Sequence, residues 1–262
     1  MPNPEYTQLI LDLDGTVYLD GLPIGRVIEQ INTLAARGVN VTVLTNNTSV
    51  SKSDYVSKLQ RLGLNVRLEQ IITPAEVAGS YLREHHGPNP RGFVLGTPAL
   101  RRQLSDNHGI VHTDAAAQFV LLSFDRTLNY PKLQRAAELI NAGVPYYLTN
   151  IDVNCPTRDG PIPDCGSFAR MLEDVTGVQP LTHFGKPGEV MAAYLKQNVA
   201  EKALLAGDRL YTDIELGVRM GVDTLLVFSG ETKAEDLPDS SIQPRHTALT
   251  LEAFLADYFD LR

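Results

Sequence analysis

The stretch that decides the fold is LILDLDGTVYLDG at residues 9–21. It begins as an apolar run typical of a strand that is buried on both faces, yet Asp12 and Asp14 lie in it two residues apart. Side chains two residues apart on a strand point the same way, so these carboxylates repel each other unless a cation or a shared proton lies between them. The stretch therefore predicts a buried strand whose two acidic residues need a partner.

The composition is that of an ordinary globular protein, with 262 residues of which 43% are hydrophobic and 21% are charged. A formal net charge of −8 leaves no basic surface for phosphates, so we expect no nucleic acid partner. The start of the chain lacks a signal-peptide pattern, and no apolar run approaches the roughly 20 residues that cross a bilayer. We therefore expect a cytoplasmic protein with no membrane partner. Cys155 and Cys165 match neither a disulfide framework nor a zinc site, so we expect reduced thiols.

Strand-like apolar runs alternate with helical patterns along the chain, which predicts an α/β fold with parallel sheets covered on both faces. Strands are predicted at 8–13, 39–44, 92–95, 118–123, 145–148, 203–206 and 223–228. Helices are predicted at 25–37, 51–62, 74–85, 97–105, 130–141, 165–176, 187–197, 211–220 and 250–259. Thr73 and Thr97 each precede a proline and are predicted helix caps, and Glu76 is predicted to complete a capping box with Thr73.

Polar residues gather at the expected carboxyl ends of the strands, where open α/β sheets bind ligands. Asp12, Asp14 and Asp208 can supply oxygen ligands to a hard divalent cation such as Mg²⁺. The full set, in chain order, is Asp12 and Asp14 after the first strand, Thr45, Asn46 and Asn47 after the second, Lys186 after a short apolar stretch, and Asp208 and Asp213 after the strand 203–206.

This set is chemically suited to phosphoryl transfer. Lys186 and a cation would offset the charge of a phosphoryl group, while the Thr45 hydroxyl and the backbone N–H groups after it would hold the non-bridging oxygens. One carboxylate could attack phosphorus, and another could act as general acid and then as general base. Asp213, one helical turn after Asp208, is better placed to hold metal-bound water than to bind the metal.

The motifs DLDGT, TNN, GKP and GDRLYTD resemble, in this order, the four motifs of the haloacid dehalogenase (HAD) superfamily phosphatases. The long insertion between the second and third motifs resembles the NagD-like branch, which includes pyridoxal phosphatases, phosphoglycolate phosphatases, nucleotidases and 4-nitrophenyl phosphatases. The resemblance implies a doubly wound, parallel-sheet, Rossmann-like core at residues 1–77 and 180–262, with an inserted α/β cap domain at 78–179. It also implies a Mg²⁺-dependent phosphomonoesterase of broad specificity for small phosphate esters, such as 4-nitrophenyl phosphate, phosphoglycolate, nucleoside monophosphates or sugar phosphates.

The same resemblance implies a role for each motif residue. Asp12 would be the nucleophile and a metal ligand, and Asp14 would be the general acid/base and a ligand through its backbone carbonyl. The other roles are phosphate or substrate contacts for Thr45, Asn46 and Asn47, charge neutralisation by Lys186, direct metal binding by Asp208, and support of the metal site by Asp213.

The segment TNIDVNCPTRDGPIPDCG at 149–166 resembles the loop that faces the substrate in relatives. Asn150, Asp152 and Asn154 are therefore candidate substrate contacts, and the alternative is a turn, stiffened by proline and glycine, that caps the next helix. Some relatives with pyridoxal phosphatase activity carry a histidine where this chain has Cys155, which puts pyridoxal phosphate in doubt as the main substrate. An exposed face of the cap could form a homodimer interface.

Three other functions remain open. A receiver-type signalling module accepts a phosphoryl group without turnover. A much shorter chain suffices for such a module, and its acceptor Asp follows a later strand than the first. A phosphotransferase or phosphomutase of the same superfamily typically has a small helical cap after the first motif, whereas only residues 17–44 separate DLDGT from TNN. A metal-binding scaffold would not need Asp14 and Lys186 together.

Overall fold

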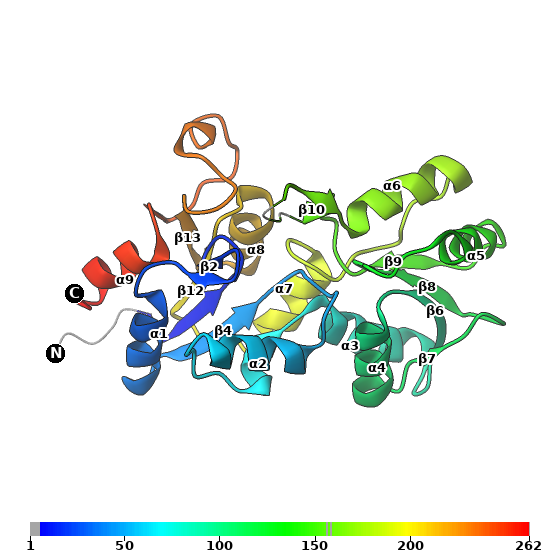
Figure 1. Cartoon of the computed structure of the whole chain (residues 1–262), viewed down its shortest axis with the longest axis horizontal. Coiled ribbons are helices and arrows are strands. Elements are labelled where there is room, and N and C mark those ends of the chain that lie inside the picture. The colour runs from blue at the N-terminus through cyan, green and yellow to red at the C-terminus, as the bar shows by residue number, and fades with distance from the viewer. Residues whose placement is uncertain (1–5, 156, 158, 262) are drawn as a thin grey trace. The chain divides into compact units, whose positions relative to one another are not determined.

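The computed structural model describes residues 6–155, 157 and 159–261, so Pro156 and Arg158 of the predicted substrate loop lie outside the described residues. The chain forms two compact units, of which the first comprises the chain up to Thr45, Ser53–Ile72 and the chain from Ala192 onward (Figure 1). The second unit comprises Asn46–Lys52 and Thr73–Met191. It contains the segment 78–179 that the sequence assigns to a cap, and it extends beyond that segment at both ends.

The first unit is built on a parallel sheet with the strand order β14-β13-β12-β1-β4-β5. Its strands are β1 (Gln8–Leu11), β4 (Asn40–Leu44), β5 (Ile71–Ile72), β12 (Ala203–Gly207), β13 (Asp223–Val227) and β14 (His246–Ala248). The chain adds β4 and β5 on one side of β1 and adds β12, β13 and β14 on the other. The sheet therefore has its topological switch point at β1, and α/β proteins bind ligands at the carboxyl edge of such a point.

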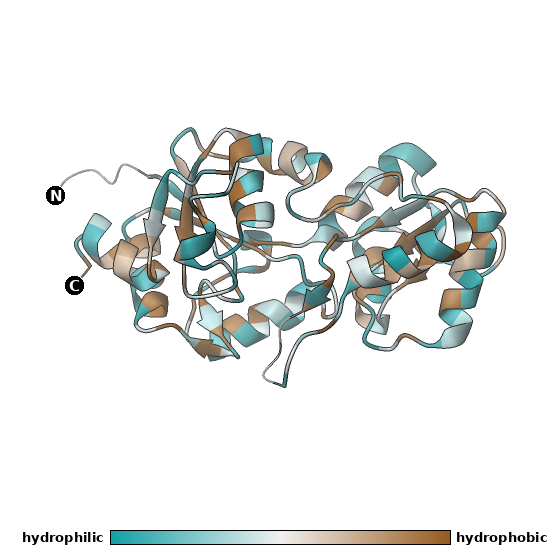
Figure 2. Cartoon of the chain, turned by 90° about the horizontal axis from the view of Figure 1, so that it is seen from above, coloured by the Kyte–Doolittle hydropathy of each residue, from teal (hydrophilic) through white to brown (hydrophobic). Residues whose placement is uncertain are grey.

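Helices cover both faces of this sheet, which explains why the three consecutive residues Leu9, Ile10 and Leu11 of β1 are all apolar and buried. Leu9 and Leu11 belong to a core formed with residues of α1 (Val27–Ala36), α2 (Lys52–Arg61) and α9 (Leu251–Tyr258). Ile10, on the opposite face, lines a small cavity with Tyr194 and Leu195 of α7 (Glu189–Lys196). Figure 2 shows the same pattern as brown apolar strands flanked by helices that alternate between teal and brown.

The remaining elements of the first unit are a hairpin of β2 (Tyr18–Leu19) and β3 (Leu22–Pro23), short helical turns at Leu68–Gln70, Leu210–Ile214 and Ala234–Asp236, and α8 (Glu215–Met220).

The second unit has its own parallel sheet, in the order β7-β6-β8-β9. Its elements are α3 (Pro74–His86), β6 (Arg91–Leu95), α4 (Pro98–His108), β7 (Val111–His112), β8 (Phe119–Leu122), α5 (Tyr130–Asn141), β9 (Tyr146–Leu148), the hairpin β10 (Asn154–Cys155) and β11 (Ile162–Pro163), and α6 (Cys165–Thr176). The predicted α/β class is confirmed in both units. Among the described residues, no helix is both long enough and apolar enough to cross a membrane.

The two predicted helix caps differ in outcome. Thr97 caps α4, since its hydroxyl accepts a hydrogen bond from a backbone N–H of the first turn at 3.3 Å. The capping box predicted for α3 is wrong, because the buried Thr73 hydroxyl has no hydrogen-bond partner among the described residues. The Glu76 carboxylate instead accepts hydrogen bonds from Lys52 and Gln103, so tertiary contacts replace the local cap.

Candidate active site

Three carboxylates meet at the carboxyl edge of the first unit's sheet. Asp12 directly follows β1, Asp208 directly follows the neighbouring strand β12, and Asp213 lies in the helical turn that comes next. One oxygen of each of these residues lies within 4.8 Å of the other two. Three anions at this spacing repel one another without a cation, and carboxylate oxygens are the ligands that Mg²⁺ prefers. The donor set therefore fits a hard divalent metal ion.

The Asp208 carboxylate is fixed by a loop that follows β13. The backbone N–H of Glu231 donates to Asp208 Oδ2 at 2.7 Å, and that of Thr232 donates to the Asp208 carbonyl at 3.2 Å. A Cβ atom on Gly230 would lie 2.0 Å from Asp208 Oδ2, and one on Gly15, whose φ is +85°, would lie 2.6 Å from it. Only glycine allows both segments to approach the carboxylate this closely. The signal for this loop in the sequence is the pair Ser229-Gly230, which comes shortly after β13 and was not among the predicted site residues.

Asp213 is packed against the end of β12. Its Oδ2 accepts a hydrogen bond from the Arg209 backbone N–H at 3.2 Å, and the side chain is 1% exposed. A Cβ atom on Gly207 would lie 2.2 Å from Asp213 Cγ, so the carboxylate sits directly against the strand's last residue. This position suits a residue that supports the metal site, and its oxygen is also near enough to the other two to be a ligand itself.

Asp14 is exposed and is contacted by a tyrosine that sequence analysis did not single out. The Tyr18 hydroxyl donates to Asp14 Oδ2 at 3.2 Å, and the Lys58 ammonium lies 3.8 Å from the centre of the Tyr18 ring. Burial, reinforced by the negative charge of Asp14, raises the pKa of Tyr18, so the phenol stays protonated and acts as a donor. The only sign of this contact in the sequence is the short spacing, since Tyr18 follows Asp14 by four residues.

Thr45 follows β4, the neighbour of β1 on the side opposite β12. Leu11 pairs with Val43 in the parallel register, so Asp12 and Thr45 leave the same edge of the sheet from adjacent strands. Thr45 is 3% exposed. The hydroxyl of Thr16, a residue that sequence analysis also passed over, lies 3.5 Å from Asp12 Oδ2. The first unit thus brings Asp12, Asp208 and Asp213 together, with Asp14 two residues beyond Asp12 and Thr45 directly after the adjacent strand at the same edge.

Most of the other predicted site residues form a polar network in the second unit. Asn46 Nδ2 and Asn150 Nδ2 both donate to Asp152 Oδ2, each at 2.8 Å. Asn46 also forms two hydrogen bonds with the backbone of Lys186. Asn150, Lys186 and Asp152 are 0%, 3% and 6% exposed, respectively.

Two predicted substrate contacts lie outside this network. Asn47 Oδ1 accepts hydrogen bonds from the backbone N–H and the hydroxyl of Ser49, at 2.9 and 2.8 Å, which makes a local turn. Asn154 is exposed on β10. The predicted loop 149–166 ends in a helix cap, since the Asp164 carboxylate accepts the N–H of Cys165 at the start of α6.

Known proteins resemble this chain over nearly its whole length. Residues 9–110 match a family described as haloacid dehalogenase-like hydrolase, and residues 183–254 match a second HAD hydrolase-like family. The chain is 31% identical to the 5'-nucleotidase YutF of Bacillus subtilis, over 95% of this chain and 98% of that protein.

Solved structures share the fold, and two of them serve as examples. The 4-nitrophenylphosphatase of Thermotoga maritima superposes with a TM-score of 0.90 at 33% identity, covering 97% of this chain and 98% of that one. The glycerol phosphate phosphatase of Mycobacterium tuberculosis in complex with magnesium gives a TM-score of 0.88 at 28% identity, covering 97% of this chain and 78% of that one. The chain therefore belongs to the haloacid dehalogenase superfamily, in its NagD-like branch, and with it to a family of phosphoric monoester hydrolases.

Proposed function

We propose that the protein is a Mg²⁺-dependent phosphomonoesterase that forms an aspartyl phosphate on Asp12. The main support is the cluster of Asp12, Asp208 and Asp213, whose oxygens converge at the switch point of the first unit's sheet. When bound there, Mg²⁺ would supply positive charge that offsets the charge of a phosphoryl group. The M. tuberculosis relative has been solved in complex with magnesium and in complex with calcium, which supports a hard divalent metal ion at this place.

Asp12 and Asp14 divide the chemistry between them. A carboxylate oxygen of Asp12 attacks phosphorus and forms a new O–P bond, while the bond from phosphorus to the ester oxygen breaks. Asp14 gives its proton to the departing alkoxide. It then takes a proton from a water molecule that attacks the aspartyl phosphate, which releases inorganic phosphate and restores Asp12. The exposure of Asp14 and its hydrogen bond from Tyr18 suit a carboxyl group that exchanges protons in a fixed orientation.

Thr45 and Lys186 would stabilise the transferring group. The Thr45 hydroxyl would donate to a phosphoryl oxygen, and the Lys186 ammonium would neutralise charge on the same group. Lys186 is only 3% exposed, and an ammonium is costly to bury unless anions are near it. A phosphoryl group and carboxylates are anions of the required kind.

We propose that the substrates are small phosphate esters and that the phosphoryl group provides most of the recognition. The relatives named above include a 5'-nucleotidase, a 4-nitrophenylphosphatase and a glycerol phosphate phosphatase. Within the loop 149–166, Asn154 is exposed, whereas Asn150 and Asp152 are buried, so Asn154 is the best candidate to contact the organic part of a substrate. Exchanging this loop with that of a relative should change the ranking of substrates more than it changes turnover of 4-nitrophenyl phosphate.

The decisive test is a phosphate-release screen over a panel of metabolite phosphates, with Mg²⁺ and with EDTA. Asp12→Asn serves as the blank, and Asp20→Asn is the matched control, because Asp20 is exposed on the nearby hairpin and its positive φ of 51° also suits asparagine. We expect many turnovers for the native chain and the control, and none for the blank or in EDTA. Near-native turnover in EDTA or in Asp12→Asn would refute the mechanism. Release of at most one phosphate per chain would instead indicate a phospho-acceptor module.

A further inference from the structure

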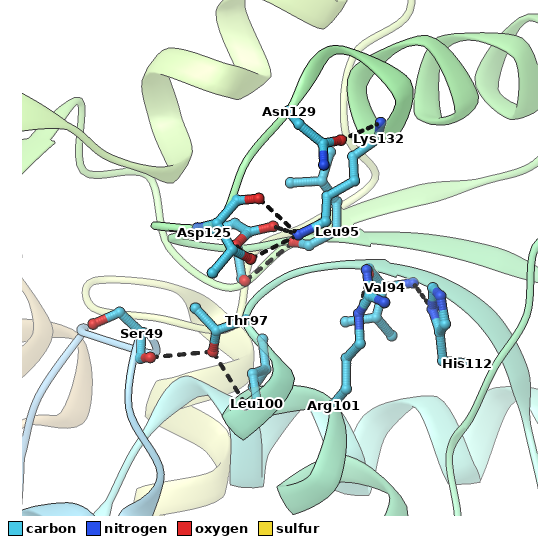
Figure 3. Close-up of polar contacts among 12 residues, drawn as sticks. Ser49, Val94, Leu95, Thr97, Leu100, Arg101, His112, Asp125, Asn129 and Lys132 are labelled. Carbon is cyan, nitrogen blue, oxygen red and sulfur yellow. Dashed lines mark hydrogen bonds and ion pairs between the residues drawn. The ribbon is translucent and has the colours of Figure 1, made fainter.

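The segment Asn46–Lys52, which follows Thr45, is built into the second unit. Thr97, which follows β6, donates through its hydroxyl to the Ser49 carbonyl at 3.1 Å, and Figure 3 shows Thr97 between Ser49 and Leu100. Thr149, which follows β9, contacts the Thr48 hydroxyl at 3.3 Å. The carboxyl edge of this second sheet, where an α/β fold offers a ligand site, thus holds a segment of the chain itself.

Asn46 is the first residue of this segment, and both N–H donors of its side-chain amide are engaged in hydrogen bonds. Its Oδ1 accepts the Lys186 N–H at 2.7 Å, and its Nδ2 donates to the Lys186 carbonyl at 3.2 Å and to Asp152 Oδ2 at 2.8 Å. A carboxamide has two N–H donors, and both are engaged in these contacts. No donor of the side chain is left for a phosphate oxygen.

The groups around Asn46 are themselves held firmly. Asn150, which is 0% exposed, donates to Asp152 Oδ2 at 2.8 Å and to Asp164 Oδ1 at 3.1 Å, and it accepts from the Thr149 hydroxyl at 2.9 Å. A Cβ atom on Gly185 would lie 2.7 Å from Asn46 Oδ1, so the chain before Lys186 presses directly against the amide. A buried polar network in which each amide hydrogen has an acceptor is rigid and specifies a single geometry.

We propose that Asn46 is a positioning residue for Lys186, that Asp152 fixes Asn46, and that neither acts by contacting the phosphate. Lysine carries its charge on a flexible stem of four carbons, so the place of its ammonium depends on how firmly its backbone is held. A displacement of about 1 Å in a catalytic group can lower a rate by about 100-fold. This role deepens the proposed function, because it presupposes that Lys186 neutralises the phosphoryl group.

A double-mutant cycle on activity tests whether Asn46 acts through Lys186. Asn46→Ala should lower kcat/KM for 4-nitrophenyl phosphate by about 10- to 100-fold in the native background. In the Lys186→Met background the same substitution should cost less than about twofold, because the group that it positions is gone. An equal loss in both backgrounds would show that Asn46 contacts the substrate independently, and it would overturn the proposal.

Amide hydrogen exchange at Lys186, measured by NMR, tests the positioning without any activity. Asn46→Ala and Asp152→Ala should each speed exchange of the Lys186 N–H at least about tenfold, because the acceptor is removed in the first variant and left unanchored in the second. Asp152→Asn keeps an oxygen that can accept both amide donors and should stay within about threefold of the native rate, as should the control Asn154→Ala.

Unchanged exchange in Asn46→Ala, or equally fast exchange in Asp152→Asn and Asp152→Ala, would overturn the proposal. The exchange result is independent of the reaction mechanism. If Asp12→Asn remained active while Lys186 exchange behaved as expected, the proposed function would fail and the positioning contact would stand.

Discussion

Replacing Glu76 by glutamine should destabilise the second unit by about 3 kcal/mol at pH 7. Glu76 lies on α3 with its side chain 13% exposed. Its carboxylate accepts hydrogen bonds from Lys52 Nζ at 3.2 Å and Gln103 Nε2 at 2.9 Å, and it lies 3.8 Å from His108 Nε2. Glutamine has the same shape but no charge, and one of its two terminal atoms is a donor that would face these donors.

The magnitude follows from the pKa of Glu76. Burial alone would raise this pKa, but the contacts with His108, Lys52 and Gln103 outweigh burial and lower it from 4.5 to about 2. A difference of this size between the unfolded and folded states corresponds to about 3 kcal/mol. Because the folded-state pKa is the lower one, the stabilisation is complete above about pH 5.5 and is lost as the pH falls toward 2. About 1 kcal/mol of it is lost by pH 4.

Urea unfolding at pH 7 and pH 4 would measure this effect. The chain contains no tryptophan, so far-ultraviolet circular dichroism is the suitable signal. Glu84→Gln, at an exposed position of the same helix, is the matched control and should change the free energy of unfolding by less than about 0.5 kcal/mol at either pH. The reasoning is refuted if Glu76→Gln costs no more than the control at pH 7, or if its cost is as large at pH 4 as at pH 7.

Three further outcomes are expected. Tyr18→Phe removes the hydrogen bond to Asp14 and should lower kcat for 4-nitrophenyl phosphate about tenfold, and an unchanged kcat would contradict an orienting role. At pH 8, a thiol reagent should modify the half-buried Cys155 long before Cys165, because burial raises the pKa of Cys165 to about 12 and leaves only about 10⁻⁴ of it ionised; equal rates would contradict this. Gly230→Ala would place a methyl group against a carboxylate of the acidic cluster, and a Mg²⁺ titration of activity should show affinity weakened at least tenfold; an unchanged affinity would argue against a metal at that place.

Patterns in the sequence were sufficient to predict the long elements of the fold. The strand at β1 and the strand at β12 are apolar on both faces because helices cover both faces, and such runs are easy to recognise. The short strands β5, β7 and β14 were missed, because two or three residues are too few to show a periodicity. Strand order also lay beyond the sequence pattern, since it depends on pairing between distant segments.

The acidic residues of the site could be predicted because each follows a recognisable strand. The contact of the Glu231 backbone could not be predicted, since a backbone N–H has no sequence signature and its role appears only when two loops meet. The contact of Tyr18 was missed although this residue follows Asp14 by only four positions. The hydrogen bonds of Asn46 also could not be predicted from the sequence. Its position after Thr45 favours a phosphate contact, whereas its partner Lys186 lies 140 positions away along the chain and comes next to it only in the folded structure.

The passage of Asn46–Lys52 through the second unit also matters for recombining this protein with its relatives. The chain passes between the units at four places, namely Thr45–Asn46, Lys52–Ser53, Ile72–Thr73 and Met191–Ala192. A chimera that exchanged only the long insert would join a native Asn46–Lys52 to foreign counterparts of Asp152, Glu76 and Lys186. The segments Asn46–Lys52 and Thr73–Met191 should therefore be exchanged together. We expect functional chimeras to arise when both segments are taken from the same parent.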